Sequence, residues 1–217
     1  MNSKPLKDYW NKKFSKQNIF GEDPTDFAKD FLSFAKDNSI KSVLDLGCGQ
    51  GRDSIFFDKK GLDVTGLDIS EEAIKFLKEN YNNVDWVLGN FGDLSIFGED
   101  LFDGVFSNLS FQYSSREEYK IYIRGINRIL KPGGYLFCTL KNLKDKNFGR
   151  GREVEKNVFE VHGGVLRHFF EKEEIEEALK DFEIIKLEED SHVMPDSSDS
   201  SNNLNPSAYW KVIARKI

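Results

Sequence analysis

A glycine-rich turn carries the strongest chemical signal in this chain. The segment Val43–Leu46 is typical of a short buried strand, and Gly47, Gly49 and Gly51 follow it at alternate positions before a helical segment. Glycine allows positive φ and lets the backbone pass close to a ligand, and free N–H groups at a helix start suit a nucleotide-like molecule. Asp68 ends the next strand about 20 residues further on, where a carboxylate binds two ribose hydroxyls. We therefore expect a ligand that contains adenosine.

The spacing of these glycines distinguishes two kinds of cofactor. The dinucleotide fingerprint G-x-G-x-x-G needs glycine or alanine at position 52, where this chain has Arg52. Asp45 instead leads a D-x-G-x-G-x-G pattern, which resembles motif I of the class I S-adenosylmethionine-dependent methyltransferases. Other segments resemble that superfamily in the same order, over about residues 32–140, and the phrase around the turn is similar to the small-molecule branch that includes tellurite-resistance and thiopurine methyltransferases. These segments are Gly66–Ser70, Gly89–Phe91, Phe102–Asn108 and Leu130–Gly134.

The resemblance implies S-adenosyl-L-methionine as the cofactor and S-adenosyl-L-homocysteine as the product. Asp68 would bind the ribose hydroxyls and Asp45 would help orient the ammonium group of the methionine part. Asn90 stands where many members have aspartate, and an amide oxygen accepts a hydrogen bond more weakly than a carboxylate does. An aromatic N-terminal arm that includes Trp10 is expected either to cover the cofactor as a lid or to pack on the sheet. The cofactor-binding residues that we expect are Trp10, Asp45, Gly47, Cys48, Gly49, Asp68, Ile69, Asn90, Phe91, Asn108 and Leu109.

Methyl transfer by in-line displacement depends on positioning, so it leaves few residues with a catalytic role. Gln112 and Tyr113 directly follow the fourth strand and are candidates near the methyl acceptor. The unperturbed imidazole of histidine titrates close to neutral pH, so His168 is a candidate proton acceptor, with a structural hydrogen bond as the alternative. His162 and Arg167 are candidates for binding an anionic substrate. The three histidines lack the spacing of metal ligands, and we expect no metal.

Strands and helices alternate along the chain. Strands are expected at 43–46, 64–67, 84–88, 102–106 and 135–140, and a helix over 116–130 is predicted by the capping pair Ser115 and Glu118. A helix near the N-terminus is expected to begin with Asp23 as N-cap and Pro24 as its first residue. The last two strands, 182–187 and 208–215, have no helix between them and should pair antiparallel, joined by a mobile loop over 191–207.

The predicted fold class is α/β, with a Rossmann-like, doubly wound and mostly parallel seven-stranded sheet in the order 3-2-1-4-5-7-6. The last strands form an antiparallel hairpin, an arrangement that the methyltransferase resemblance also implies. We expect a single domain over residues 1–217. Its parts are an N-terminal helical arm or cap (1–36), a cofactor-binding core (40–140), a substrate-side segment (141–170), and a C-terminal helix with the β-hairpin (171–217).

Composition limits the partners and the compartment. The 217 residues suit one domain of ordinary size. Acidic and basic residues, 37 against 31, are mixed along the chain, so the net charge of −6 gives no general field for nucleic acid or anionic membranes. The two cysteines read as reduced thiols, and no apolar run has the length of a signal peptide core or a membrane span. We expect a cytoplasmic protein, monomeric or homodimeric, that binds neither nucleic acid nor membranes.

The resulting functional prediction is a methyltransferase that acts on a small-molecule acceptor. Two alternatives remain at this level: a methyltransferase that acts on a protein or RNA, and a non-catalytic regulatory subunit that binds S-adenosylmethionine. A basic stripe beside the site would favour RNA. Intact binding motifs argue for cofactor binding without proving catalysis.

Overall fold

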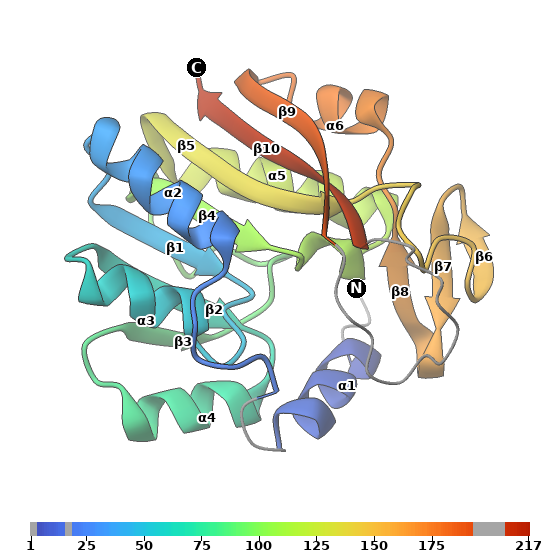
Figure 1. Cartoon of the computed structure of the whole chain (residues 1–217), viewed down its shortest axis with the longest axis horizontal. Coiled ribbons are helices and arrows are strands. Elements are labelled where there is room, and N and C mark those ends of the chain that lie inside the picture. Colours follow the sequence, from blue (N-terminus) through green and yellow to red (C-terminus); the bar gives the residue numbers. More distant parts are fainter. Residues whose placement is uncertain (1–3, 16–18, 193–206) are drawn as a thin grey trace.

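A seven-stranded sheet forms the centre of the computed structural model, which describes residues 4–15, 19–192 and 207–217 (Figure 1). Its strand order is β3-β2-β1-β4-β5-β10-β9. The first five strands are parallel, and β10 pairs antiparallel with both β5 and β9. This confirms the predicted fold class. The strand order also matches the prediction, since β9 and β10 are the sixth and seventh strands of this sheet along the chain. The strands are β1 (Ser42–Leu46), β2 (Asp63–Asp68), β3 (Asp85–Leu88), β4 (Phe102–Asn108), β5 (Leu130–Lys141), β9 (Phe182–His192) and β10 (Ser207–Lys216).

Helices cover both faces of this sheet, as the alternation of side chains along each strand requires. On one face, Val43 of β1 packs in a cluster with Phe31 of α2 and Phe57 of α3. On the other, Leu44 packs in a cluster with the apolar stripe of α5 and with Ile175 of α6. The flanking helices are α2 (Asp26–Asp37), α3 (Arg52–Lys59), α4 (Glu71–Asn80), α5 (Arg116–Ile129) and α6 (Lys172–Ala178).

The start of α5 agrees with the sequence prediction, and the start of α2 does not. Ser115 and Glu118 form the expected capping box at the start of α5. The expected N-cap at Asp23 is wrong: α2 begins at Asp26, and Thr25 is its N-cap, with Oγ1 accepting a hydrogen bond from Ala28 N at 3.1 Å. Thr25 also binds a neighbouring carboxylate, a tertiary contact that the local Asp-Pro signal does not contain.

The segment between β5 and α6 forms a second sheet that the sequence analysis did not anticipate. Its strands are β6 (Arg152–Glu155), β7 (Val158–Val161) and β8 (Val165–His168), all antiparallel, with the short helix η2 (His162–Gly164) between β7 and β8. This small sheet lies beyond the carboxyl end of β5 (Figure 1). The fifth strand, expected at 135–140, begins earlier: Leu130–Gly134 is already part of β5, and the register with β4 shifts there.

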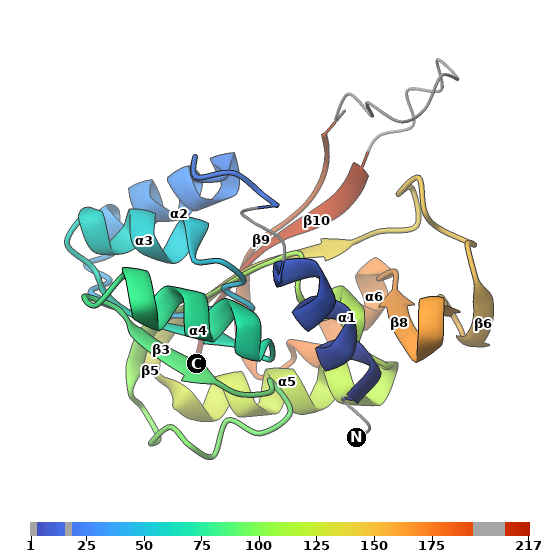
Figure 2. The same cartoon turned by 90° about the horizontal axis from the view of Figure 1, so that it is seen from below.

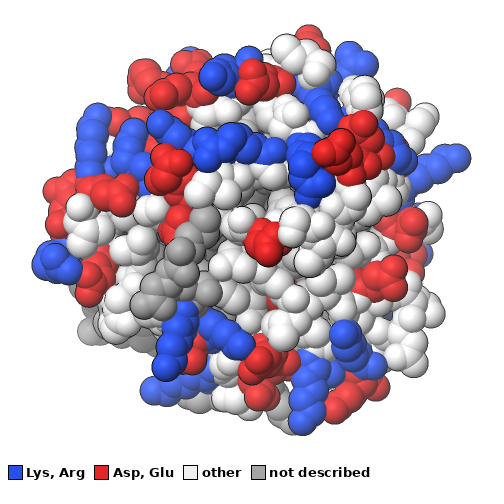
Figure 3. Space-filling model, turned by 180° about the vertical axis from the view of Figure 1, so that it is seen from behind, with Lys and Arg blue, Asp and Glu red and all other residues white. Residues whose placement is uncertain are grey.

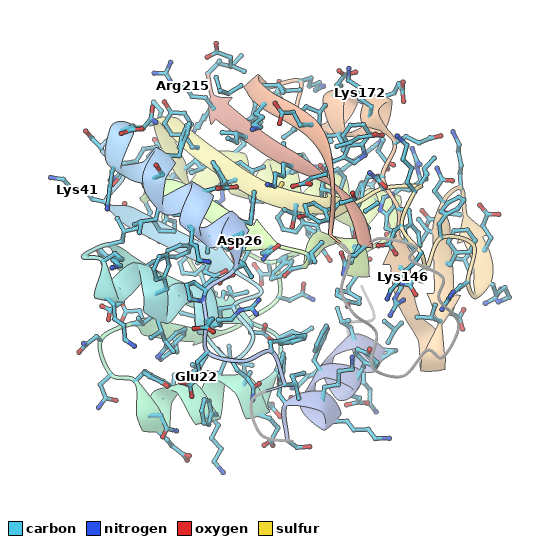
Figure 4. All side chains as sticks on the ribbon, viewed as in Figure 1. Glu22, Asp26, Lys41, Lys146, Lys172 and Arg215 are labelled. Atoms are coloured by element: carbon cyan, nitrogen blue, oxygen red, sulfur yellow. The ribbon has the colours of Figure 1, made fainter. Side chains whose placement is uncertain are left out.

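The N-terminal helix α1 (Lys4–Phe14) lies between α4 and β8, across the carboxyl edge of the parallel strands (Figure 2). Figure 4 shows Asp26 and Lys146 near this edge, and Lys41 and Arg215 near the opposite one. The predicted mobile loop over 191–207 lies largely outside the described residues. Within the described part of the chain, no helix combines the length and apolar character needed to cross a bilayer.

Candidate functional site

A cavity of about 660 Å³ opens at the carboxyl ends of the parallel strands, beneath α1. Ligand sites of this volume are typical for small molecules, and this edge of the sheet is where open α/β folds bind them. All the residues predicted to bind the cofactor line this one cavity. They are Trp10, Asp45, Gly47, Cys48, Gly49, Asp68, Ile69, Asn90, Phe91, Asn108 and Leu109.

The glycine turn forms the floor of the cavity. Gly47 has φ +81°, and a Cβ atom there would lie 2.2 Å from Ser110 Oγ. Gly49 has φ +55°, and a Cβ atom there would meet the Phe14 ring at 3.3 Å. The N–H groups of Gly47 and Cys48 both donate to the carbonyl of Leu67, at 2.7 and 3.1 Å. The turn is therefore anchored to the end of β2, and a larger residue would narrow the space above it.

Asp68 is held at the edge of the turn by the backbone. Its Oδ2 accepts from Gly49 N at 2.9 Å and its Oδ1 from Ser70 N at 2.8 Å. The side chain is only 7% exposed, and this burial raises its pKa while the backbone N–H groups oppose the rise. Each carboxylate oxygen has a second lone pair, so the oriented group can still accept hydrogen bonds from a diol.

Asp45, one strand away, is also buried, with 3% of its surface exposed. Its Oδ2 accepts a hydrogen bond from Ser54 Oγ at 2.5 Å. Burial raises the pKa of Asp45 to about 8, and the nearby carboxylates of Asp53 and Asp68 add to the rise. A cationic group placed in the cavity would favour the ionised form. The site is thus suited to an ammonium group that approaches Asp45.

Asn90 and Phe91 line the cavity beyond β3. The Asn90 oxygen already accepts from Gly92 N at 2.9 Å, so this residue both stabilises its own turn and lines the cavity. The Phe91 ring packs edge-to-face against Phe111 and Tyr122, with ring centroids 5.8 and 5.5 Å apart. These contacts hold an apolar wall in place.

The sequence analysis missed a polar network on the opposite wall. Thr25 donates from its backbone N and its Oγ1 to the carboxylate of Asp53, both at 2.9 Å. Asn108 Nδ2 in turn donates to Thr25 Oγ1 at 3.3 Å, and Thr139 Oγ1 donates to Asn108 Oδ1 at 2.7 Å. Leu109, held with φ +53°, donates its N–H to Thr139 Oγ1 at 2.9 Å. The residues of this network are far apart in the sequence. The one local signal for it was Thr25, a residue type that is favoured as a helix N-cap.

Aromatic side chains of α1 cover the cavity. Trp10 stacks on Phe14 with centroids 5.0 Å apart and meets the Tyr113 ring edge-on at 5.3 Å. Asn11 Oδ1 accepts from Ser70 Oγ at 2.8 Å, which ties the helix to the start of α4. Phe14 is the buried residue of this helix, and the others stay at least partly exposed. This arrangement has the form of a cover over the cavity.

The three candidate catalytic residues are distributed over two cavities. Tyr113 and Gln112 line the large cavity and also a second one of about 170 Å³. His168 lines only the second; it is fully buried, stacks on Phe170 at 3.8 Å, and places Nε2 3.1 Å from Glu174 Oε2. Burial raises the pKa of Tyr113, so its hydroxyl is a hydrogen-bond donor at neutral pH rather than a base.

The central part of the chain is similar in sequence to known methyltransferases. Residues 43–134 match the family model described as a methyltransferase domain. TehB of Haemophilus influenzae, described as a probable S-adenosyl-L-methionine-dependent methyltransferase, is 34% identical over 132 residues. That match covers 59% of this chain and 43% of TehB, so the sequence similarity spans less than half the length of this relative.

Solved structures share the fold over nearly the whole chain. The crystal structure of H. influenzae TehB has a TM-score of 0.67 at 25% identity and covers 97% of this chain and 67% of its own. The 1,6-didemethyltoxoflavin-N1-methyltransferase of Burkholderia thailandensis, solved with 1,6-didemethyltoxoflavin and S-adenosylhomocysteine bound, has a TM-score of 0.69 at 22% identity. That alignment covers 97% of this chain and 87% of the other. The family resemblance inferred from the glycine turn is thereby confirmed.

Proposed function

The chain carries a methyltransferase domain of the class I S-adenosylmethionine-dependent superfamily, and on that premise we propose that it methylates a small-molecule acceptor. The observation that carries the proposal is the single cavity in which the glycine turn, Asp45, Asp68 and the covering helix α1 meet. The cofactor and the acceptor would share this cavity and its smaller neighbour.

The donor groups around the cavity fit S-adenosylmethionine. Asp68, already oriented by two backbone N–H groups, would accept the ribose hydroxyls. Asp45 would face the ammonium group, whose charge compensates for the burial of that carboxylate. Ile69 and Phe91 would pack on the adenine, and Asn90 would offer it a hydrogen bond. When bound, this cofactor supplies an electrophilic methyl group on a positively charged sulfur.

The chain's own residues would then align the acceptor and exclude water. Trp10 and Phe14 cover the cavity, and aromatic faces favour a nearby cation while keeping the site dry. Tyr113 would donate a hydrogen bond to the acceptor because its raised pKa keeps it protonated. Gln112 lines both cavities and would orient the acceptor between them. Positioning of this kind lowers the barrier by replacing a bimolecular encounter with a prealigned one.

A small acceptor fits the surroundings of the site better than a macromolecule. Helix α1 lies across the carboxyl edge (Figure 2), and the smaller cavity holds only about 170 Å³. Acidic and basic side chains are intermixed around a largely uncharged area on the face shown in Figure 3. A nucleic acid would favour a continuous basic stripe. The toxoflavin methyltransferase of B. thailandensis, a structural neighbour, supports a small-molecule acceptor by analogy of fold.

Calorimetry with S-adenosylhomocysteine tests the cofactor part of this proposal, with NAD as the comparison ligand. We expect S-adenosylhomocysteine to bind and NAD to give no heat of binding. Incubation with S-adenosylmethionine and a panel of small acceptors should then release S-adenosylhomocysteine, measured by mass spectrometry. Cofactor binding with turnover only on protein or RNA would instead support the macromolecular alternative, and binding without any turnover would support a regulatory subunit.

A further inference from the structure

The smaller cavity is built differently from the large one that it adjoins. Residues after the ends of β4 and β5 line it together with residues at the end of β8. Because its lining comes from β5 and the loops of the main sheet and from β8 of the small sheet, the cavity lies between these two sheets. Its lining is Gln112, Tyr113, Lys141, Asp145, Asn147, Arg167, His168 and Phe169, most of them polar or charged.

Lys141 and Asp145 form an ion pair in the wall of the smaller cavity, and their opposite charges cancel. Lys141 Nζ donates to Asp145 Oδ2 at 2.6 Å, and both side chains are largely buried. The Asp145 carboxylate also accepts from Asn147 N at 2.9 Å and from Ala208 N at 3.2 Å. Lys141 and the backbone N–H groups keep the pKa of Asp145 below its usual value despite burial. This pair adds no net charge to the cavity.

Arg167 adds a positive charge that is not compensated in this way. It lies on β8, is half-buried, and lines the same cavity. Among the described residues, no carboxylate forms an ion pair with its guanidinium. The Arg167 charge also acts on the Tyr113 hydroxyl, opposing the effect of burial on the pKa of that group. With two cations and one carboxylate (Lys141, Arg167 and Asp145), the lining has a net charge of +1.

Two buried polar atoms of the lining residues also lack partners within the described part of the chain. They are Gln112 Oε1 and His168 Nδ1, on side chains of residues that are 8% and 0% exposed. His168 Nε2 faces Glu174, which itself pairs with Arg116 at 3.1 Å. A hydrogen on Nε2 would be donated to Glu174 Oε2 and would leave Nδ1 as an acceptor. Unpartnered buried polar groups are costly, so a ligand that donates to Gln112 Oε1 would relieve one of them.

We propose that this smaller cavity is the acceptor subsite and takes a single-ring carboxylic acid that carries a hydroxyl or amino group. The carboxylate would pair with the Arg167 guanidinium, which matches its geometry with two parallel N–H groups. The ring hydroxyl or amine would donate to Gln112 Oε1, at the boundary with the large cavity. This assignment rests on the proposed methyltransferase function and names the acceptor class for it.

The size of the cavity limits the acceptor. A cavity of about 150 Å³ holds a molecule the size of benzene, and this one has about 170 Å³. A volume of this size admits an acceptor with one ring. Because Gln112 and Tyr113 line both cavities, the group bonded to Gln112 is the one placed toward the cofactor, and we expect it to be methylated. An O–CH3 or N–CH3 bond would form as the CH3–S bond of S-adenosylmethionine breaks, the sulfur would keep that electron pair, and the proton released by the hydroxyl or amine would pass to water.

Titration of matched acids and amides tests the subsite. The protein, saturated with S-adenosylhomocysteine, is titrated with the ortho, meta and para hydroxybenzoates and with the corresponding hydroxybenzamides, which have the same shape without the charge. We expect at least one acid to bind about 10- to 100-fold more tightly than its amide, the range of a charge-assisted hydrogen-bonded pair. Arg167→Gln should abolish this preference, and Arg167→Lys should retain part of it.

Arg150→Gln is the matched control, because Arg150 is exposed and lines neither cavity. It should keep the preference for the acid. Equal binding of acid and amide, an undiminished preference in Arg167→Gln, or no binding of any acid would overturn the subsite. The S-adenosylhomocysteine affinity, measured in the same samples, separates this result from failure of the proposed function, which would appear as loss of cofactor binding in the unaltered protein.

Discussion

The Asp68 carboxylate accepts a hydrogen bond from the backbone N–H of Gly49 at 2.9 Å. This bond joins the glycine turn after β1 to the end of β2, and it sets the acidic group beside the part of the turn that lines the cavity. The same carboxylate holds the first residue before α4 through Ser70 N. One side chain therefore shapes the cavity floor and presents its remaining acceptor capacity to the ligand.

Asp68→Ala should weaken S-adenosylhomocysteine binding by about 1.5–3 kcal/mol, the range for hydrogen bonds to a charged group. Calorimetry measures the change directly. Asp63→Ala is the control, since Asp63 lies at the other end of the same strand and is exposed. Unchanged affinity in Asp68→Ala would show that Asp68 does not bind the ribose.

Gly47→Ala should destabilise the protein more than Gly61→Ala does. Both glycines have positive φ, which costs an L-residue about 1–2 kcal/mol. Only at position 47 would the new methyl group also meet Ser110, and overpacking costs about 1–3 kcal/mol more. A Cβ atom at position 61 has no atom within 4 Å. Chemical denaturation measures the two losses, and equal losses would mean that the turn has room that the structure does not show.

The free energy of unfolding of the ligand-free protein should contain a component that falls as pH rises. Asp45 has a pKa of about 8 in the folded protein, against about 3.9 in an unfolded chain. Between these values the folded protein retains a proton that the unfolded chain has released, so this contribution is full below about pH 4 and is lost by about pH 8. Denaturation curves across this window measure it. Asp45→Asn should flatten the dependence, and an unchanged slope in that variant would refute the assignment.

Removal of residues 1–14 should leave a folded core with weaker cofactor affinity and little activity. Phe14 is the buried residue of α1, and the helix is tied to α4 by surface contacts such as Lys7 to Glu71 at 2.7 Å. Circular dichroism checks the fold and calorimetry checks the affinity. Full affinity in a folded truncated protein would show that α1 is no lid. Failure to fold would show that its aromatic residues belong to the core.

Trp10→Ala separates the covering ring from the rest of the helix. Trp10 contacts Phe14 and Tyr113 over the cavity but is itself only partly buried. The variant should stay folded and show the same direction of change as the truncation, with a smaller loss of cofactor affinity. A loss of stability without any loss of affinity would assign this ring to packing.

Local patterns were sufficient for the parts of the fold that depend on neighbours in sequence. The capping box at Ser115 and Glu118 predicted the start of α5. The antiparallel pairing of the last two strands was predicted because the sequence between them has no helical period, and the Asp45-to-Gly51 turn with Asp68 predicted the family. The capping box and the glycine turn depend on backbone geometry within a few residues. The pairing of the last two strands depends on the tendency of successive strands to lie side by side.

Only the tertiary structure decided the rest of the site. Helix α2 begins after Thr25, which is hydrogen-bonded to Asp53, and not at Asp23. Arg167, on the small sheet, lines the same cavity as Gln112. His168, a candidate base because histidine titrates close to neutral pH, proved to be buried against Glu174 and outside the large cavity. These contacts join residues far apart in the chain, and no periodicity or spacing encodes them. The sequence by itself determined the cofactor motif and the sheet, because backbone turns and strand patterns are local; the acceptor side depends on long-range packing, which only the folded chain brings together.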